Sequence, residues 1–249
     1  MDDPITVAYR RAMERAITAF NAGNQLEALK EFEGAIALAD RIPDAERQRS
    51  AVRHTALTLV RGQFARMGRS LAKRAVELDE RANQKRDHAQ DLLTLGWASL
   101  QLREFDDADT AFAKALDVAL ANGDYDTAAG ASTNLAIVIG ARGFTRPPAT
   151  TRAIKLLRDS LRYLERRGNG EFEITTRVAL IQALEAERAD PAEVFEVARA
   201  LYDRFSKQLR KDQWDNTLGP LRQALSRHVE THPGLDRREW MRAKFPELL

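Results

Sequence analysis

Small and large apolar residues follow one another at a helical spacing of three and four positions, and the pattern returns about every forty residues. This spacing places them on one face of a helix. A repeat of this length predicts helical hairpins, each covering an apolar face of the next. The copies are Ala28, Phe32 and Ala35; Gly68, Ala72 and Ala75; Ala108, Phe112 and Ala115; and Ala153, Leu157 and Ser160, the last displaced by five residues.

Each copy has a small residue on a predicted partner helix upstream. Small residues at matched places let two helices approach closely, and larger neighbours fill the seam between them. The segment 143–150, with Pro147 and Pro148, accounts for the five-residue displacement because two prolines forbid a continuous helix. The upstream residues are Ala16, Ala56, Gly96 and Ala136, and a fifth, degenerate unit carries Ala179, Leu180, Ala198 and Leu201.

Capping residues and helix breakers predict the helix boundaries. Asn122-Gly123 ends one helix, and Asp190-Pro191 begins another with an N-cap followed by proline. We expect residues 1–210 to form the repeat array and residues 211–249 to form a helical cap of the same solenoid. The predicted helices span residues 4–21, 24–41, 44–66, 68–83, 86–102, 105–121, 125–142, 149–167, 171–188 and 191–210, with 212–231 and 235–247 in the tail.

The repeated positions resemble the tetratricopeptide repeat (TPR), in a variant nearer forty residues than the usual 34. The resemblance rests on Leu95, Gly96, Leu100, Phe105, Ala108, Phe112 and Ala115, and on Ala16, Phe20, Gly23, Leu26, Ala28, Phe32 and Ala35. It covers roughly residues 5–205 and implies an all-α fold, a right-handed α-solenoid of about five antiparallel helix pairs. Few Gly and Pro residues and abundant Ala, Leu, Arg and Glu also favour an all-helical chain.

The resemblance further implies a groove, since the first helix of each TPR pair lines a concave surface that binds peptides or partner helices. The terminal-carboxylate clamp of the chaperone-type members is not expected, because Met13 and Ile17 occupy its places. Alternatively, the same side chains pack against one another or against the C-terminal helices. The implied groove residues are Met13, Ile17, Phe20, Asn21, Arg53, Leu57, Val60, Arg61, Leu93, Trp97, Leu100, Gln101, Asn134 and Ile137, with Thr133, Gly140 and Ala141 beside them.

Charge alternates in sign from one repeat to the next although the net charge of the 249 residues is only +2. Residues 1–40, 91–140 and 171–190 are net negative, whereas 41–90 and 141–170 are net positive. One interpretation is attraction between neighbouring repeats; the other is a basic patch for an acidic partner. Nucleic acid is not favoured, because acidic blocks interrupt the basic ones. The patch comprises Arg142, Arg146, Arg152, Lys155, Arg158 and Arg162, continuing to Arg166 and Arg167.

Several function classes lack their sequence signals. The chain has no cysteine, no apolar run of membrane-spanning length and no apolar leader, so we expect a cytoplasmic protein without disulfides. Nucleotide-binding and hydrolase glycine motifs are absent. His228 and His232 share a helix face, but Pro233 follows directly and the metalloprotease order is missing, so we expect no metal or other cofactor.

The sequence thus predicts a non-enzymatic scaffold or adaptor that binds a protein or peptide. The alternatives are a regulatory peptide sensor, similar to the peptide-binding halves of bacterial quorum-sensing regulators, and an RNA-binding helical-repeat protein. Those regulators usually carry an N-terminal helix-turn-helix domain, for which a repeat beginning near residue 5 leaves no room. Trp214, Trp240 and Phe245 either cap the last repeat or form a dimer face, which leaves a homo-oligomer open.

Overall fold

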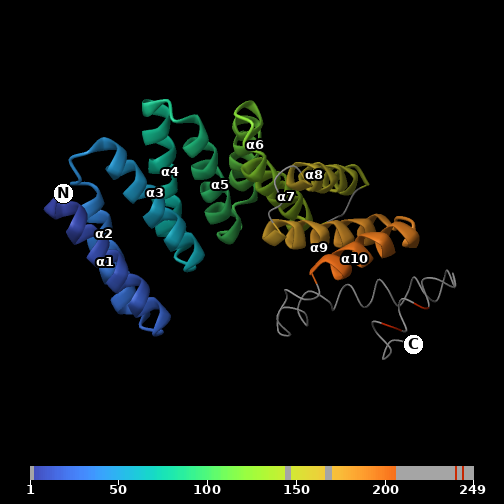
Figure 1. Cartoon of the computed structure of the whole chain (residues 1–249), viewed down its shortest axis with the longest axis horizontal. Coiled ribbons are helices and arrows are strands. Elements are labelled where there is room, and N and C mark those ends of the chain that lie inside the picture. Colours follow the sequence, from blue (N-terminus) through green and yellow to red (C-terminus); the bar gives the residue numbers. More distant parts are fainter. Residues whose placement is uncertain (1–2, 144–146, 166–169, 206–238, 240–242, 244–249) are drawn as a thin grey trace. The chain divides into compact units, whose positions relative to one another are not determined.

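The computed structural model describes residues 3–143, 147–165, 170–205, 239 and 243. The chain forms two compact units, Met1–Thr127 and Ala128–Leu249, and each is described by itself. Helices joined by short turns make up both units, and no strand occurs in the described residues (Figure 1). The fold is all-α, as predicted.

Six helices and the first turn of a seventh build the first unit. Consecutive helices are antiparallel hairpins whose seam is the unit's apolar core, with Phe32 and Leu59 fully buried in it. The helices are α1 (Pro4–Asn21), α2 (Gln25–Ala39), α3 (Ala45–Arg61), α4 (Ala65–Ala82), α5 (Lys85–Gln101) and α6 (Phe105–Ala121).

The second unit contains most of α7 (Tyr125–Ala141), then α8 (Pro147–Glu165), α9 (Gly170–Glu187) and α10 (Pro191–Phe205). Its apolar core holds one polar cluster at the repeat position of Ser160, where the other copies carry alanine. The Ser160 hydroxyl lies 2.9 Å from the Thr133 hydroxyl and donates to the Ala129 carbonyl at 3.0 Å, and Thr176 lies 2.8 Å from Thr133. The three hydroxyls therefore satisfy one another inside the core.

The predicted helices agree with the structure except at the turn between α3 and α4. The sequence predicted a helix to residue 66, but α3 ends at Arg61 and α4 begins at Ala65. Gln63 has a left-handed backbone, with φ of 64°, and the Phe64 amide donates to the Leu59 carbonyl at 2.9 Å, which closes a Schellman turn. Phe64 is partly buried and packs edge-on against Phe20, which anchors the turn. The predicted cap, 211–249, lies almost entirely outside the described residues.

This turn geometry repeats with the sequence. The left-handed positions that follow the first helix of each pair are Gly23, Gln63, Arg103, Gly143 and Arg188. The first four are forty residues apart each time, and the last follows after forty-five. Three of the five are not glycine, so no glycine motif in the sequence marked them. The repeat is therefore visible in the backbone conformation of the turns as well as in the apolar pattern of the helices.

The small residues at the pair seams are buried, which confirms the predicted close approach of paired helices. Ala16, Ala28 and Ala108 are 0% exposed, and Gly96 has no space for a side chain. A methyl group on Gly96 would lie 2.4 Å from the Phe112 ring, well inside van der Waals contact. The ring of α6 thus rests on the bare backbone of α5.

None of the helices in the described part of the chain is long and apolar enough to cross a membrane.

We expect Gly96→Ala to destabilise the first unit by about 1–3 kcal/mol, because the added methyl group forces the Phe112 ring or α5 to move. Gly34→Ala is the matched control: Gly34 also lies within a helix, but nothing stands within 4 Å of the added methyl group. That variant should gain about 0.5–1 kcal/mol from helix propensity. Urea unfolding measures the free energy of unfolding of both variants, and we expect changes of opposite sign. Equal changes would contradict the close packing of the Phe112 ring on Gly96.

Candidate functional site

The first helices of the three pairs in the first unit lie alongside one another. The Tyr9 hydroxyl of α1 donates to the Ala51 carbonyl of α3 at 3.0 Å. At the other end of α3, the Gln101 side-chain amide of α5 donates to the Val60 carbonyl at 3.0 Å. These bonds connect α1 to α3 and α3 to α5. We call the side of these three helices that carries the predicted groove positions the first-helix face.

Most of the predicted groove residues in the first unit reach this surface. They are partly solvent-exposed apolar side chains with a few exposed polar ones beside them. Half-buried are Ile17, Phe20, Leu57, Leu93, Trp97 and Leu100, and exposed are Asn21, Arg61 and Gln101. Met13 and Val60 are exceptions: they are 3% and 1% exposed and pack in the core, because α1, α3 and α4 close over them. We remove these two from the candidate contacts.

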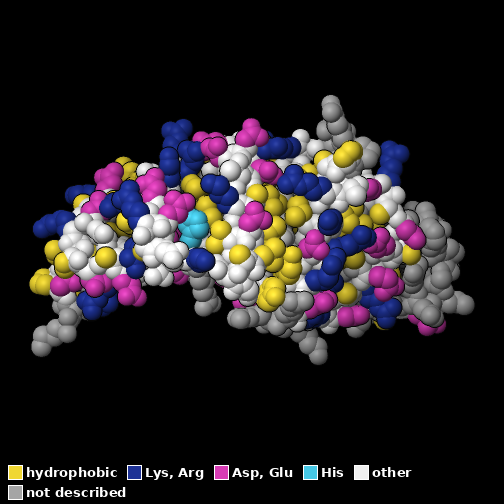
Figure 2. All heavy atoms as spheres, turned by 90° about the horizontal axis from the view of Figure 1, so that it is seen from above, with side chains coloured by type: hydrophobic (Ala, Val, Ile, Leu, Met, Phe, Trp, Pro, Cys, Tyr) yellow, Lys and Arg dark blue, Asp and Glu magenta, His cyan; other side chains and the backbone are white. Residues whose placement is uncertain are grey.

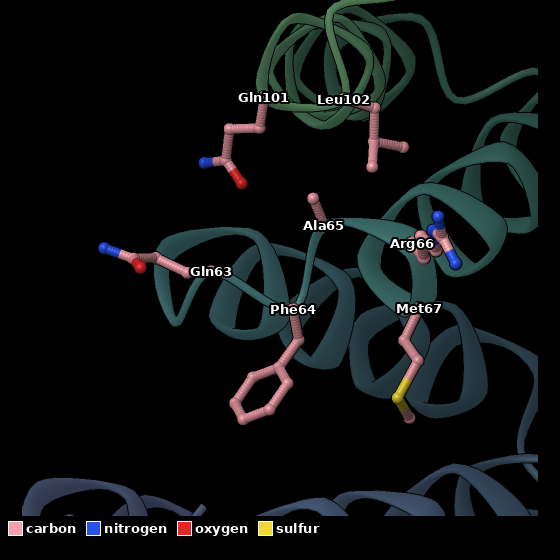
Figure 3. A pocket seen from close by; sticks show the side chains of 7 residues that line it. All are labelled: Gln63, Phe64, Ala65, Arg66, Met67, Gln101 and Leu102. Carbon is pink, nitrogen blue, oxygen red and sulfur yellow. The ribbon is translucent and has the colours of Figure 1, made fainter.

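A hollow of about 670 Å³ lies where α3 and α5 end. Figure 3 shows Gln101 and Leu102 extending from the end of α5 toward Ala65, whereas Phe64 and Met67 extend away from Gln101 and Leu102. Gln101 belongs both to this hollow and to the first-helix face, so the two are continuous. The hollow was not predicted, because it depends on the turn at residues 62–64 that the sequence placed later.

Arg53, one of the implied groove residues, lies among three aspartates. Its guanidinium is 2.9 Å from Asp79 Oδ2 on α4, 3.1 Å from Asp91 Oδ1 on α5 and 3.1 Å from Asp87 Oδ2. Arg49 approaches Asp79 from the same side at 3.9 Å. Arg53 therefore joins α3 to α4 and α5, and its charge is compensated within the protein.

The carboxylate pair inside this cluster carries a perturbed acid. Asp79 and Asp91 are each 1% exposed. Burial raises the pKa of Asp91 to about 8; attraction to Arg53 opposes this increase, and the neighbouring Asp79 adds to it. Asp91 is therefore largely protonated at neutral pH, which leaves the cluster close to electrical balance.

The second unit uses its predicted groove positions differently. Asn134 is 7% exposed, and its side-chain amide donates to the Gly130 carbonyl one turn earlier at 2.8 Å. Thr133 belongs to the buried hydroxyl cluster, whereas Ile137 is half-buried. Asn134 thus faces its own helix, and we remove it from the candidate contacts to a bound peptide backbone.

Solved structures of helical-repeat proteins resemble this chain at low sequence identity. Aspartyl phosphate phosphatase F from Bacillus subtilis has a TM-score of 0.73 at 13% identity, covering 90% of this chain and 59% of its own. A Podosopora anserina protein named for kinesin light chain, with nearly identical TPR-like repeats, has a TM-score of 0.63 at 14% identity, covering 84% and 100%. The Rap conjugation gene regulator of plasmid pLS20, solved with the Phr* peptide, has 0.57 at 14%, covering 95% and 63%.

The similar structures include proteins named for TPR-like repeats and for a tetratricopeptide repeat sensor, and this chain likewise consists of successive helix pairs in its described part. The chain has the TPR fold. No family model matches the sequence, and no curated protein matches it. The chain spans about three fifths of the length of the Bacillus subtilis phosphatase and of the pLS20 regulator.

Several charged side chains of neighbouring helix pairs contact one another, which agrees with one of the two interpretations of the charge alternation. In the first unit Arg74 of α4 pairs with Asp40, and Arg69 lies 2.9 Å from Glu104. In the second unit Arg158 of α8 pairs with Glu193 of α10. On the face that Figure 2 shows, basic and acidic side chains are interspersed rather than gathered by sign.

This pairing weakens the alternative of a basic patch for an acidic partner. Besides the Arg158 pair, Arg162 lies 3.0 Å from Asp159. Arg142, Arg152 and Lys155 are exposed, and Arg146 lies outside the described residues. In the part of the patch that the structure describes, acidic side chains thus lie among the basic ones and pair with some of them.

A second groove of the TPR array, about 940 Å³, lies between α4 and α6 over α5. Leu92 and Leu95 form part of its lining, and its charged residues are of both signs, such as Lys73 and Glu77. The sequence analysis did not single out this groove. Among the described residues, no group of three or more histidine, aspartate or glutamate side chains is placed to hold a metal ion; His228 and His232 lie outside them.

We expect the raised pKa of Asp91 to make folding stability depend on pH. The folded state binds a proton that the unfolded chain releases near its ordinary value of 3.8, so the free energy of unfolding should fall as pH rises from about 4 to about 8. The slope due to this group is at most about 1.4 kcal/mol per pH unit. The side chain of Asp91→Asn is neutral at every pH. The free energy of unfolding of this variant, relative to that of the native protein, should therefore increase with pH across this pH range and level off above the range.

Urea unfolding at a series of pH values measures this difference. Asp117→Asn, at an exposed position of α6, is the matched control and should show no such trend. A pH-independent difference between Asp91→Asn and the native protein would mean that Asp91 is ionised throughout.

Proposed function

We propose that this TPR protein is a non-enzymatic scaffold that binds a peptide or a partner helix on the first-helix face of residues 1–127, in the cytoplasm as the sequence predicts. One observation carries the proposal: half-buried apolar side chains occur at the predicted groove positions of three first helices that are hydrogen-bonded to one another. They are Ile17, Leu57, Leu93, Trp97 and Leu100. Apolar area left in water at one place is typical of an interaction site.

The polar surroundings of this row fit a partner that is apolar at its centre. Asp79 and Asp87 compensate Arg53 and its neighbour Arg49, with Asp91 largely protonated beside them, so the cluster offers no net cation there. Trp97 is the largest side chain of the row and the one with the greatest potential as an anchor, since tryptophan is enriched among residues that dominate binding energy. An amphipathic helix or an apolar peptide would place its side chains against this row.

The similar structures support a peptide as the partner class. The pLS20 regulator was solved in complex with the Phr* peptide, so a protein of this fold and of comparable helix arrangement accommodates one. This supports the second candidate function, a regulatory peptide sensor, in which the bound peptide is the signal. The phosphatase activity in the name of the Bacillus subtilis protein belongs to that protein, whose chain is longer than this one.

We expect Trp97→Ala to weaken peptide binding at least tenfold, because truncating a central tryptophan removes its apolar contact with the partner. Peptides selected from a displayed random library on the native protein would supply the ligand, and isothermal titration would give the affinities. Leu26→Ala is the matched control: Leu26 is 85% exposed but lies on α2, away from the first-helix face.

Far-UV circular dichroism confirms that both variants remain helical. Peptides that bind Trp97→Ala and Phe20→Ala as tightly as the native protein would contradict the proposed face. Binding of RNA that weakens steeply with salt and ignores Trp97 would instead support the RNA-binding alternative.

A further inference from the structure

The groove of about 940 Å³ between α4 and α6 is built from three helices of the first unit, with α5 between the other two (Figure 1). On each helix the lining residues recur at three and four positions, so they form one stripe along that helix. The stripe of α5 forms the floor and consists of Leu92, Leu95, Ser99 and Leu102. The groove therefore follows the long axes of the helices over a largely apolar floor.

The groove opens on the side of α5 opposite to Trp97. Successive residues of a helix are turned by about 100°, so Leu95, two residues before Trp97, is turned by about 200° from it. Leu95 lines the groove, whereas Trp97 is a half-buried residue of the first-helix face. A partner in the groove would leave Trp97 uncovered, and the groove is therefore a separate surface.

Arg69 closes one end of the groove. Its guanidinium lies 2.9 Å from Glu104 Oε2, donates to the Ser99 hydroxyl at 3.3 Å and pairs with Asp107. Arg69 thereby joins α4 to α5 and α6, and its charge is compensated within the protein. Along the rest of the groove, no ion pair joins α4 to α6 among the described residues.

Three exposed charges border this unbridged part. They are Lys73 and Glu77 on α4 and Lys114 on α6, and none of the three forms an ion pair with another described residue. The forty-residue repeat places Lys114 at the level of residue 74, about 1.5 Å along the axis from Lys73. Two lysines therefore line opposite walls at nearly the same level, and Glu77 lies one turn further along the α4 wall.

These two lysines depart from the charge pairing between neighbouring helix pairs. Residues 41–90 are net positive and 91–140 are net negative, and Lys114 is one of only two basic residues in the second block. Opposite charges of the two blocks meet at Arg69, but at Lys73 and Lys114 like charges line the two walls. An acidic side chain between these lysines would replace the repulsion by attraction from both walls.

The size of the groove indicates the form of the partner. From Arg66 to Glu80 the α4 stripe is about 21 Å long, at 1.5 Å per residue. A volume of about 940 Å³ over this length gives a mean cross-section of about 45 Å². A β-strand with its side chains takes about 48 Å², the product of the strand and sheet spacings, whereas an α-helix 10 Å across takes about 80 Å². An extended segment therefore matches the groove better than a helix does.

We propose that the α4–α6 groove binds an extended segment of a protein partner in which an acidic, an apolar and a basic residue follow one another. In an extended chain alternate side chains point to opposite sides, and residues two positions apart are separated by about 6.6 Å. This distance agrees with the separation of about 6 Å between Lys73 and Glu77 along α4. The acidic side chain lies between Lys73 and Lys114, and the basic one lies at Glu77. The apolar side chain points the other way, to the floor at Leu92 and Leu95.

This inference goes beyond the proposed function, because it adds a second partner surface on the opposite side of α5. A scaffold with both surfaces can hold one partner at Trp97 and another in the groove at the same time.

Nuclear magnetic resonance of the Leu95 methyl groups tests the groove, and Leu95→Met assigns their signals. The probe is the capped peptide acetyl-Thr-Glu-Val-Lys-Thr-amide, whose β-branched residues favour an extended chain. Three matched peptides replace its glutamate by lysine, its valine by serine or its lysine by glutamine. Lys73→Gln and Lys114→Gln each remove one ammonium group from an exposed position, and Lys30→Gln, at an exposed position of α2 outside the groove, is the matched control.

We expect a saturable shift of the Leu95 signals with the probe, and about three- to fivefold weaker binding in Lys73→Gln and in Lys114→Gln but not in Lys30→Gln. Each altered peptide should bind the native protein more weakly than the probe does. The double variant Lys73→Glu, Lys114→Glu should instead prefer the peptide with lysine in place of glutamate. Such an exchange of preference does not arise from a structural effect of the substitutions.

The proposal is overturned by the absence of a saturable Leu95 shift, by binding that is unchanged in both lysine variants, or by helical carbon chemical shifts of the bound probe. Thermal melting identifies a variant that fails to fold, and the other variant then decides.

The readout also separates this proposal from the proposed function. The Leu95 methyl signals report on the groove, whereas the indole signal of Trp97 reports on the first-helix face. A Leu95 shift with an unchanged Trp97 signal supports the groove, whether or not any peptide binds the first-helix face. Selected peptides that shift Trp97, together with a Leu95 signal that does not respond to the probe, would support the proposed function and remove the groove.

Discussion

The contact between a bare backbone on one helix and an aromatic ring on the next is the constraint on which the first unit depends. Because Gly96 has no side chain, Phe112 rests directly on α5 and fixes how closely α5 and α6 approach. The rotation of α5 about its axis is then fixed as well. The next residue, Trp97, is turned by about 100° from this seam, which leaves it half-buried on the first-helix face. Gly96 therefore has two consequences: Phe112 packs in the core, and Trp97, the candidate anchor, is left facing outward.

Local spacing explains why so much of the fold follows from the sequence. Apolar residues three and four positions apart define a helix face, and their return after forty residues defines the pairing, so the seams at Ala16 and Gly96 were predictable. The turn after Arg61 was not, because Gln63 adopts a left-handed backbone that its residue type does not announce. There the burial of Phe64 against distant aromatic residues determines the boundary.

The candidate site was predictable only as a face, since neither side-chain partners nor burial are local properties. Arg53 sits at a groove position by spacing, yet its partners Asp79 and Asp91 come 26 and 38 residues later. Val60 occupies a groove position too, but α4 lies so close that Val60 would touch any side chain placed at Gly68. The resemblance to TPR proteins predicts groove positions such as Trp97, which is half-buried, but the packing of this chain decides which of these positions water reaches.

The arginine at the centre of the first-helix face shows what a partner would meet there. Arg53 pairs with Asp79, Asp87 and Asp91, and such a cluster fixes the relation of α3 to α5 rather than adding much stability, because desolvation offsets most of the attraction between the charges. A partner at this face would therefore meet apolar side chains such as Leu57 and Trp97 beside a cation that is already compensated. An apolar peptide surface fits such a face better than an anionic one, because an anion would lose its hydration there without gaining a counter-charge.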